Sequence, residues 1–141
     1  MPKIGLDPVG RVEHRDGKIF VAMQPAYAEA LNGIEGFSHI WVIYWFHGND
    51  KPEKRHTLKV HPRGNPANPL TGVFATRSPA RPNLLGLNAC RLVRREGNRL
   101  EVEGLDAWDG SPVLDIKPYL PQLDSFPQTT FPKWADGKPP E

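Results

Sequence analysis

The chain of 141 residues is long enough for one domain with a hydrophobic core. It contains no run of 18 apolar residues, and its first ten residues lack the apolar centre of a signal peptide, so we expect a soluble, cytoplasmic protein without a membrane-spanning helix. The single cysteine, Cys90, excludes an internal disulfide and a cluster of thiolate metal ligands.

The formal net charge of +2 is spread unevenly along the chain. Residues 50–99 carry 11 Lys and Arg against 3 Asp and Glu, a charge of +8, whereas residues 1–49 sum to −1 and residues 100–141 to −5. A basic middle attracts anionic partners such as nucleic acid. Solvated loops explain the same charge equally well.

Sixteen prolines and 13 glycines leave little room for long helices. The pattern instead predicts strands, in chain order, at Lys18–Met23, Ser38–Phe46, Val73–Thr76, Arg99–Gly104 and Val113–Ile116, and one short helix at Ala26–Leu31. Short strands joined by long polar connections indicate an all-β fold, an antiparallel barrel or sandwich, as a single domain over residues 1–141.

The strongest strand signal is Ser38–Phe46. Its apolar run, Ile40 to Phe46, lacks alternation, so we expect both faces to be covered, by the core and by a second subunit. His39 and His47 flank the run about 26 Å apart, too far to share one zinc ion.

Two stretches look irregular. Gly48–Leu70 is charged and rich in proline, and we expect it to be an exposed excursion. From about residue 125 the chain is an irregular tail, which Phe126, Phe131 and Trp134 are expected to pin to a surface.

The segment Gly72–Leu87, GVFATRSPARPNLLGL, combines two prolines with Arg77 and Arg81. The prolines stiffen the loop, and forked guanidinium donors suit a carboxylate or a phosphate. A surface loop with solvated arginines is the alternative.

The segment Leu105–Pro121, LDAWDGSPVLDIKPYLP, contains a turn that begins at Asp109. Carboxylates beside such a turn can accept hydrogen bonds from ribose hydroxyls or an amino group, although Asp115 and Lys117 also read as an ordinary ion pair. The fixed ligand spacing of a calcium loop is missing, so we predict no metal site.

Several familiar motifs do not occur in the sequence. It has no glycine-rich phosphate loop, no G-x-G-x-x-G and no nucleophile elbow, so a Rossmann-type methyltransferase is unsupported. From the residues alone the chain is a small β-rich domain with a basic loop and a candidate anion site.

The two segments, together with the central strand, resemble the TrmO (YaeB-like) family of tRNA threonylcarbamoyladenosine N6-methyltransferases. Gly72–Leu87 is similar to the family's first signature, Leu105–Pro121 to its second, and FSHIW with Phe46 and His47 to its central strand. The resemblance covers residues 33–124 in the family's order. It implies an antiparallel β-barrel with long irregular loops and one short helix.

The resemblance also implies an enzyme that uses S-adenosyl-L-methionine to methylate N6 of threonylcarbamoyladenosine in the tRNA anticodon loop. Such an enzyme is usually a homodimer with the cofactor near the subunit interface. The family's cofactor-binding positions correspond here to His47, Gly48, Arg77, Leu87, Glu103, Gly104, Leu105 and Asp106.

The catalytic residues are unknown, with His47 and Asp109 as candidates to accept the proton. We expect the RNA contacts at Arg81, Asn83, Arg91, Arg94, Arg95 and Lys117. Two alternatives remain: a methyltransferase of another RNA or of a small molecule, and a non-catalytic barrel that binds S-adenosylmethionine or RNA.

The sequence departs from the family pattern in two places. Longer members carry a P-R-Q-like stretch between the first two strands, where this chain has only Asp16-Gly17. They also carry a C-terminal domain, so the resemblance is to a short member without that domain.

Overall fold

The computed structural model describes residues 1–137, which form two compact units. The barrel unit comprises Met1–His47 and Leu85–Leu120. The loop unit comprises Gly48–Leu84 and the chain from Pro121 onward. Each unit has its own kind of architecture.

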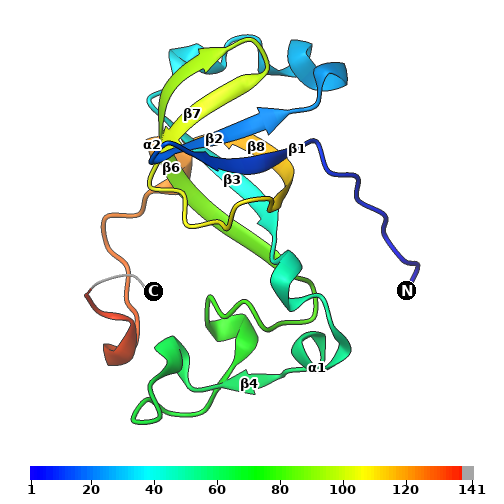
Figure 1. Ribbon diagram of the computed structural model, residues 1–141. Coiled ribbons are helices and arrows are strands. Elements are labelled where there is room, and N and C mark those ends of the chain that lie inside the picture. Colours follow the sequence, from blue (N-terminus) through cyan, green and yellow to red (C-terminus); the bar gives the residue numbers. More distant parts are fainter. Residues whose placement is uncertain (138–141) are drawn as a thin grey trace. The chain divides into compact units, whose positions relative to one another are not determined.

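The barrel unit is a closed antiparallel barrel of six strands (Figure 1). The strand order is β1-β2-β7-β6-β3-β8, and pairing of β8 with β1 closes the ring. The strands are β1 (Gly10–Arg15), β2 (Lys18–Met23), β3 (His39–Trp45), β6 (Leu85–Glu96), β7 (Arg99–Glu103) and β8 (Pro112–Pro118). The expected all-β, antiparallel barrel is confirmed.

Alternation along the strands builds the core of the barrel. Inward side chains are β-branched or long and apolar, which suits a pleated, buried surface. Several of them are fully buried: Val12, Val21, Ile40, Val42, Leu100 and Val113. The predicted strands that carry Val21, Ile40, Val42, Leu100 and Val113 are confirmed to within a few residues at their ends, whereas β1, which carries Val12, was not among the predicted strands.

A two-residue turn at Asp16 and Gly17 joins β1 to β2. Both residues have positive φ, 54° and 75°, as a tight hairpin turn with the twist of the flanking strands requires. The ladder runs up to the pair Arg15 and Lys18. The tight turn therefore fixes the register of the first hairpin.

Strand β3 alternates in burial although its sequence does not alternate in polarity. Ile40, Val42 and Tyr44 are buried, and the outward Trp41, Ile43 and Trp45 are half-buried. The expectation of two covered faces is met fully on the inner face and only partly on the outer one.

The sequence did not predict β6 as a strand, although it is the longest, with 12 residues. Its first part pairs with β3 and its second with β7, and Arg91 is opposite both His39 and Glu103. Glycine, asparagine and three arginines obscure its alternation. The buried positions, Gly86, Cys90 and Leu92, still follow a period of two.

Two local predictions differ from the structure. The short helix expected at Ala26–Leu31 is a 3-10 helix, Pro25–Leu31 (η1), and a second one follows at Ile34–Gly36 (η2). The strand expected at Val73–Thr76 is wrong, because Val73–Ala75 forms a 3-10 turn (η5). Thr76 closes that turn by donating from its backbone N and from Oγ1 to the Val73 carbonyl.

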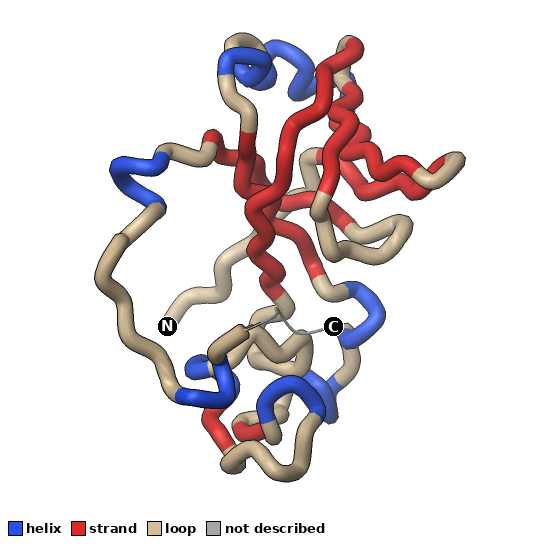
Figure 2. Tube along the Cα trace, turned by 90° about the vertical axis from the view of Figure 1, so that its left-hand side faces the viewer, coloured by secondary structure: helices blue, strands red, loops and turns tan. Residues whose placement is uncertain are grey.

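The loop unit consists of short elements joined by irregular chain (Figure 2). They are α1 (Pro52–Arg55), β4 (Lys59–Val60), η4 (Pro62–Gly64), β5 (Thr71–Gly72), η5, α2 (Pro121–Asp124) and η6 (Lys133–Ala135). The only buried residues of its described part are Pro62, Val73 and Leu84. The expected excursion after Gly48 is confirmed, and it extends further than Leu70.

The tail from residue 125 is irregular apart from η6, as expected. Phe126 and Phe131 are 72% and 57% exposed, so the expectation that they pin the tail is wrong. Trp134 is half-buried, and nearby Arg63 donates hydrogen bonds to the carbonyls of Ala135 and Asp136. Among residues 1–137, no helix is long and apolar enough to cross a membrane.

Candidate functional site

The candidate site in the barrel unit is the connection between β7 and β8, residues 104–111. It contains Gly104, Leu105 and Asp106, three of the residues predicted to hold a cofactor, and Glu103 ends the strand before it. Leu105 is buried in the core, so only its backbone is available to a ligand. Asp106 is exposed.

Tyr44 reaches this connection from β3. Its ring lies against Gly86, the opposite residue on β6, where an added Cβ would be 2.6 Å from the Tyr44 Cζ. Its hydroxyl donates to the carbonyl of Asp106 at 3.0 Å. Burial, and secondarily the charge of Asp106, raises the pKa of Tyr44, so the phenol keeps its proton and remains a donor.

Asn88 on β6 binds the same stretch through both ends of its carboxamide. Its Nδ2 donates to the carbonyl of Gly104 at 3.0 Å, and its Oδ1 accepts from the backbone N of Asp106 at 2.8 Å. The ladder between β6 and β7 stops at the pair Arg91 and Glu103. The side chain of Asn88 therefore continues the pairing where the backbone ladder has ended.

The second half of the connection is held by β1. The backbone N of His14 donates to Asp109 Oδ1 at 2.9 Å, and the ring Nε2 of His14 lies 2.9 Å from the carbonyl of Ala107. Because a carbonyl can only accept, Nε2 carries a proton. The amide of Gly110 also donates to the Val12 carbonyl at 2.8 Å. One oxygen of Asp109 is thus used to fix the backbone.

His47, which follows β3, lies beside the turn. Its ring meets that of Trp108 edge to face, with the centroids 6.3 Å apart and the planes at 85°. Trp108 is 69% exposed. Leu87, another predicted cofactor residue, is 44% exposed on the outer side of β6, opposite Ile43. These side chains offer aromatic and apolar surface to a ligand.

Gly48 and Arg77 belong to the loop unit, where Arg77 lies on a loop braced from within. Arg81 Nη1 donates to the carbonyls of Thr76 and Ser78 at 3.2 and 2.9 Å, and the Ser78 amide donates to Thr76 Oγ1. Arg77 is exposed and has no hydrogen bond or ion pair to any other described residue. A stiff loop thus presents one guanidinium with its donors available.

Arg55 braces the other end of this loop. Its Nε donates to the Pro82 carbonyl at 2.9 Å, and its Nη2 donates to Asn83 Oδ1 at 3.4 Å. A third contact joins Nη1 to Asp50 Oδ1 at 3.5 Å. Asn83, predicted to bind RNA, is therefore already bonded within the loop unit.

The arginines of the basic middle that lie on β6 face carboxylates from other segments. Arg91 pairs with Glu103 at 3.1 Å, Arg94 with Glu101 at 2.9 Å, and Arg95 with Glu35 at 3.2 Å. The local charge is therefore far smaller in space than along the sequence. Lys117 pairs with Asp115 at 3.3 Å, as the ion-pair interpretation predicted.

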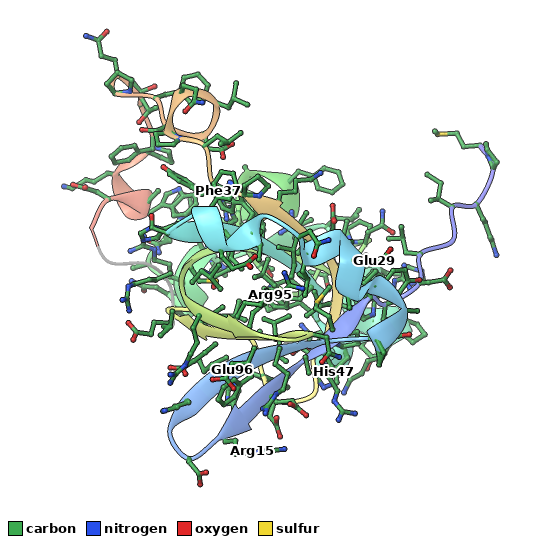
Figure 3. The ribbon with its side chains drawn as sticks, turned by 90° about the horizontal axis from the view of Figure 1, so that it is seen from above. Arg15, Glu29, Phe37, His47, Arg95 and Glu96 are labelled. Carbon is green, nitrogen blue, oxygen red and sulfur yellow. The ribbon has the colours of Figure 1, made fainter. Side chains whose placement is uncertain are left out.

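Arg95 is the most enclosed of these arginines. It donates to the carbonyls of Ala28 and Leu31 in η1, the segment that also carries Glu29 (Figure 3). Hydrogen bonds from the backbone of Glu35 itself and from Arg95 lower the pKa of the Glu35 carboxyl. Arg95 thus fastens the 3-10 segment to β6.

Sequence reasoning located the connection and the arginine loop but missed the side chains that fix them. Tyr44, Asn88, His14 and Arg55 were not singled out. A phenol within a buried apolar run needs a hydrogen-bond partner, which is the one signal that could have pointed to Tyr44. Within residues 1–137 no cluster of His, Cys, Asp or Glu could hold a metal ion.

Comparisons with known proteins add the family context. The model of the tRNA-methyltransferase O N-terminal domain matches residues 8–125. A probable S-adenosyl-L-methionine-binding protein of Pyrococcus horikoshii is 45% identical over 117 residues, 83% of this chain and 83% of that protein. A mouse protein named tRNA (adenine(37)-N6)-methyltransferase is 47% identical over 97 residues, 68% of this chain and 22% of its own length.

A crystal structure of TrmO from Pseudomonas aeruginosa superposes with a TM-score of 0.76 and 30% sequence identity. The alignment covers 99% of this chain and 65% of that chain, so the present chain spans slightly less than two thirds of the solved protein. The residues matched by the family model, 8–125, include β1, the arginine loop and the β7–β8 connection. The chain belongs to the family of the tRNA-methyltransferase O N-terminal domain.

Proposed function

We propose that this protein is an S-adenosyl-L-methionine-dependent tRNA methyltransferase, with N6 of threonylcarbamoyladenosine in the anticodon loop as the methyl acceptor. Family membership and the names of the relatives support the cofactor and the tRNA. The observation that carries the proposal is the β7–β8 connection, which the side chains of Tyr44, Asn88 and His14 hold from three strands while Asp106 stays exposed. Access to tRNA is consistent with the expected cytoplasmic location.

Taken one by one, the proposed residues have chemistry that suits different parts of S-adenosylmethionine. Arg77 offers forked donors for the methionyl carboxylate. The carboxylate of Asp106 accepts no hydrogen bond from the described part of the chain, so it is available to ribose hydroxyls or to an amino group. His47 and Trp108 supply aromatic surface for an adenine ring. We propose Gly48, Leu87 and residues 103–105 as the remaining contacts.

Bound S-adenosylmethionine supplies a methyl group that its sulfonium makes electrophilic. The chain's residues therefore have to bind and align the reactants, because alignment alone accounts for much of such a rate enhancement. Of the two candidate proton acceptors, Asp109 is partly used by the His14 amide. The His47 ring makes no hydrogen bond to another described residue, so we favour His47.

For RNA contacts we keep Arg81, Asn83, Arg91, Arg94, Arg95 and Lys117 as the proposed set. Exposed ion pairs contribute only about 0–1 kcal/mol, so an RNA phosphate can replace the carboxylate partner of Arg91 or Lys117 at little cost. Arg81 and Arg95 are held by backbone carbonyls and are the least available of the set.

We propose that the protein is a homodimer, with the outer face of β3 and β6 as its interface. That face carries half-buried Trp41 and Ile43 and the exposed Leu85, an apolar stripe on an otherwise charged barrel. Light scattering checks this, with a dimer expected and a monomer overturning it. Leu85→Glu is expected to shift the wild-type dimer toward monomer.

The activity is tested with purified protein, S-adenosylmethionine and tRNA from a strain lacking this modification. Mass spectrometry of the tRNA nucleosides should show N6-methyl-threonylcarbamoyladenosine. If the tRNA remains unmethylated although the protein binds the cofactor, threonylcarbamoyladenosine is not the methyl acceptor.

The cofactor assignment is tested separately by calorimetry. Arg77→Ala should lower the affinity for S-adenosylmethionine more than tenfold, because an arginine–carboxylate contact contributes about 1.5–3 kcal/mol. Arg63→Ala, in the same unit, is the control and should bind normally. Equal affinities in the two variants would show that Arg77 is wrongly assigned.

The names of the archaeal relatives mention binding and no reaction, which favours a second candidate, a barrel that binds S-adenosylmethionine without catalysis. Tight cofactor binding without methyl transfer to tRNA, to other RNA or to small molecules would support that candidate.

A further inference from the structure

The peptide groups of Asp106 are held from both sides by side chains of different strands. The amide of Asp106 donates to Asn88 Oδ1 on β6, and its carbonyl accepts from the Tyr44 hydroxyl on β3. Fixing both groups of one residue fixes the direction of its Cα–Cβ bond. The carboxylate, which is exposed, is therefore aimed by two residues that do not touch it.

Both of these side chains are themselves immobilised. Tyr44 is 6% exposed, lies against Gly86 and packs edge to face on Phe46, with the ring centroids 5.3 Å apart. Asn88 makes a further hydrogen bond, from Nδ2 to the Gly104 carbonyl. A group held by rigid strands is located more sharply than one held by a loop. The barrel thus sets the geometry of Asp106 directly.

We propose that Asn88 and Tyr44 are positioning residues for cofactor binding, acting through the orientation of Asp106. This inference rests on the proposed function, because it takes Asp106 as a ligand of S-adenosylmethionine. It adds two residues outside the proposed contact set, and it predicts that their effect on the ligand depends on the Asp106 carboxylate.

The first test measures hydrogen exchange of the Asp106 amide in the absence of ligand. In Asn88→Ala, hydrogen exchange of the Asp106 amide should be at least about tenfold faster, because its acceptor is gone. The matched control is Asn98→Ala, which removes a different carboxamide that donates to the Met23 carbonyl. That variant should leave exchange at Asp106 unchanged. Unchanged exchange in Asn88→Ala would overturn the inference.

The second test is calorimetry with S-adenosylmethionine on the full chain. We expect about tenfold weaker binding in Asn88→Ala and about threefold in Tyr44→Phe, with Asn98→Ala like the wild type. Tyr44→Phe keeps the ring against Gly86, so it carries the test if Asn88→Ala does not fold. Wild-type affinity in Tyr44→Phe and in folded Asn88→Ala would refute the positioning role.

A third measurement separates positioning from general stabilisation. In an Asp106→Ala background, Asn88→Ala should cause no further loss of affinity, because the carboxylate that Asn88 orients is absent. A merely structural Asn88 would cause the same loss in both backgrounds, which contradicts the inference. Failure of the proposed function is recognised differently: the wild-type protein itself would then not bind S-adenosylmethionine, and the inference would fall with it.

Discussion

The barrel unit and the loop unit are ordered by different forces. In the barrel, backbone ladders close a ring around alternating buried side chains such as Val12, Val42 and Leu100. In the loop unit almost nothing is buried, and arginine side chains hold backbone carbonyls instead, as Arg55 and Arg81 do. The contrast shows that one short chain combines a scaffold held by hydrophobic burial with a loop held by polar contacts.

This difference decides how firmly each unit holds its own residues. Burial contributes roughly 25 cal/mol per Å² and tolerates no change of register, so the barrel can hold Asp106 rigidly. Polar braces cost less to rearrange, because each contributes only about 0.5–1.5 kcal/mol. The loop that carries Arg77 is therefore held less firmly than the barrel, although Arg81 braces it from within.

The largest effect is expected from a deletion in the barrel core. Leu100→Ala should lower the free energy of unfolding by about 2–5 kcal/mol, because Leu100 is fully buried. Leu70→Ala in the loop unit removes the same atoms from a side chain that is 58% exposed, and should change stability by less than about 0.5 kcal/mol. Denaturant titration checks both variants. Equal losses of stability would contradict the difference between the barrel unit and the loop unit.

A smaller loss is expected at Gly86 on β6, against which the Tyr44 ring packs. Gly86→Ala would place a Cβ 2.6 Å from Tyr44 and should destabilise the barrel by about 1–3 kcal/mol. Gly36→Ala is the control, because nothing lies within 4 Å of a Cβ there. If thermal unfolding shifts equally in both variants, the packing of Tyr44 on Gly86 is not what limits this position.

A local effect is expected in the loop unit. Arg81→Ala removes two hydrogen bonds to the carbonyls of Thr76 and Ser78, and should weaken the loop by about 1 kcal/mol. Hydrogen exchange should rise over residues 76–80 and stay constant in β2. Faster exchange across the barrel as well would mean that the two units do not behave as separately ordered regions.

A further effect, confined to alkaline pH, is expected from Cys90 in the barrel wall. Burial raises the pKa of its thiol from 9.0 to about 12. The unfolded chain releases this proton near pH 9 and the folded barrel retains it, so the stability due to Cys90 is complete below about pH 9 and declines as pH rises toward about 12. Denaturant titrations of wild type and Cys90→Ala at about pH 8 and about pH 10 should show a steeper decline in the wild type. If the free energy of unfolding declines equally in both proteins, Cys90 is not the source of the pH dependence.

The same contrast explains how far the sequence could be interpreted. Lys18–Met23 and Arg99–Glu103 were predicted because burial on a strand leaves a period of two in the sequence. Val73–Ala75 was mistaken for a strand because its turn is decided by a hydrogen bond from Thr76, which leaves no periodic pattern in the sequence. Strand β6 was missed because its outward positions mix leucine, alanine and arginine, and because glycine and asparagine stand among its inward positions.

The contacts of the candidate site were beyond prediction for a related reason. Asp106 and Tyr44 are 62 residues apart in sequence, and Asp106 and Asn88 are 18 apart. The pairing of β6 with both β3 and β7 brings them together. The charge of the middle segment was misleading in the same way, because Glu35 in η2 and Glu103 on β7 reach its arginines from other segments.

The turn at Asp16 and Gly17 is a position where residues can be inserted into the barrel unit. A Cβ placed at Gly17 would meet no atom within 4 Å beyond its two chain neighbours, and the ladder is already complete at Arg15 and Lys18. Lengthening a flexible connection is inexpensive, about 0.6 kcal/mol for each doubling. New sequence can therefore be grafted at this tip, by evolution or by an engineer, without retuning the scaffold beneath it.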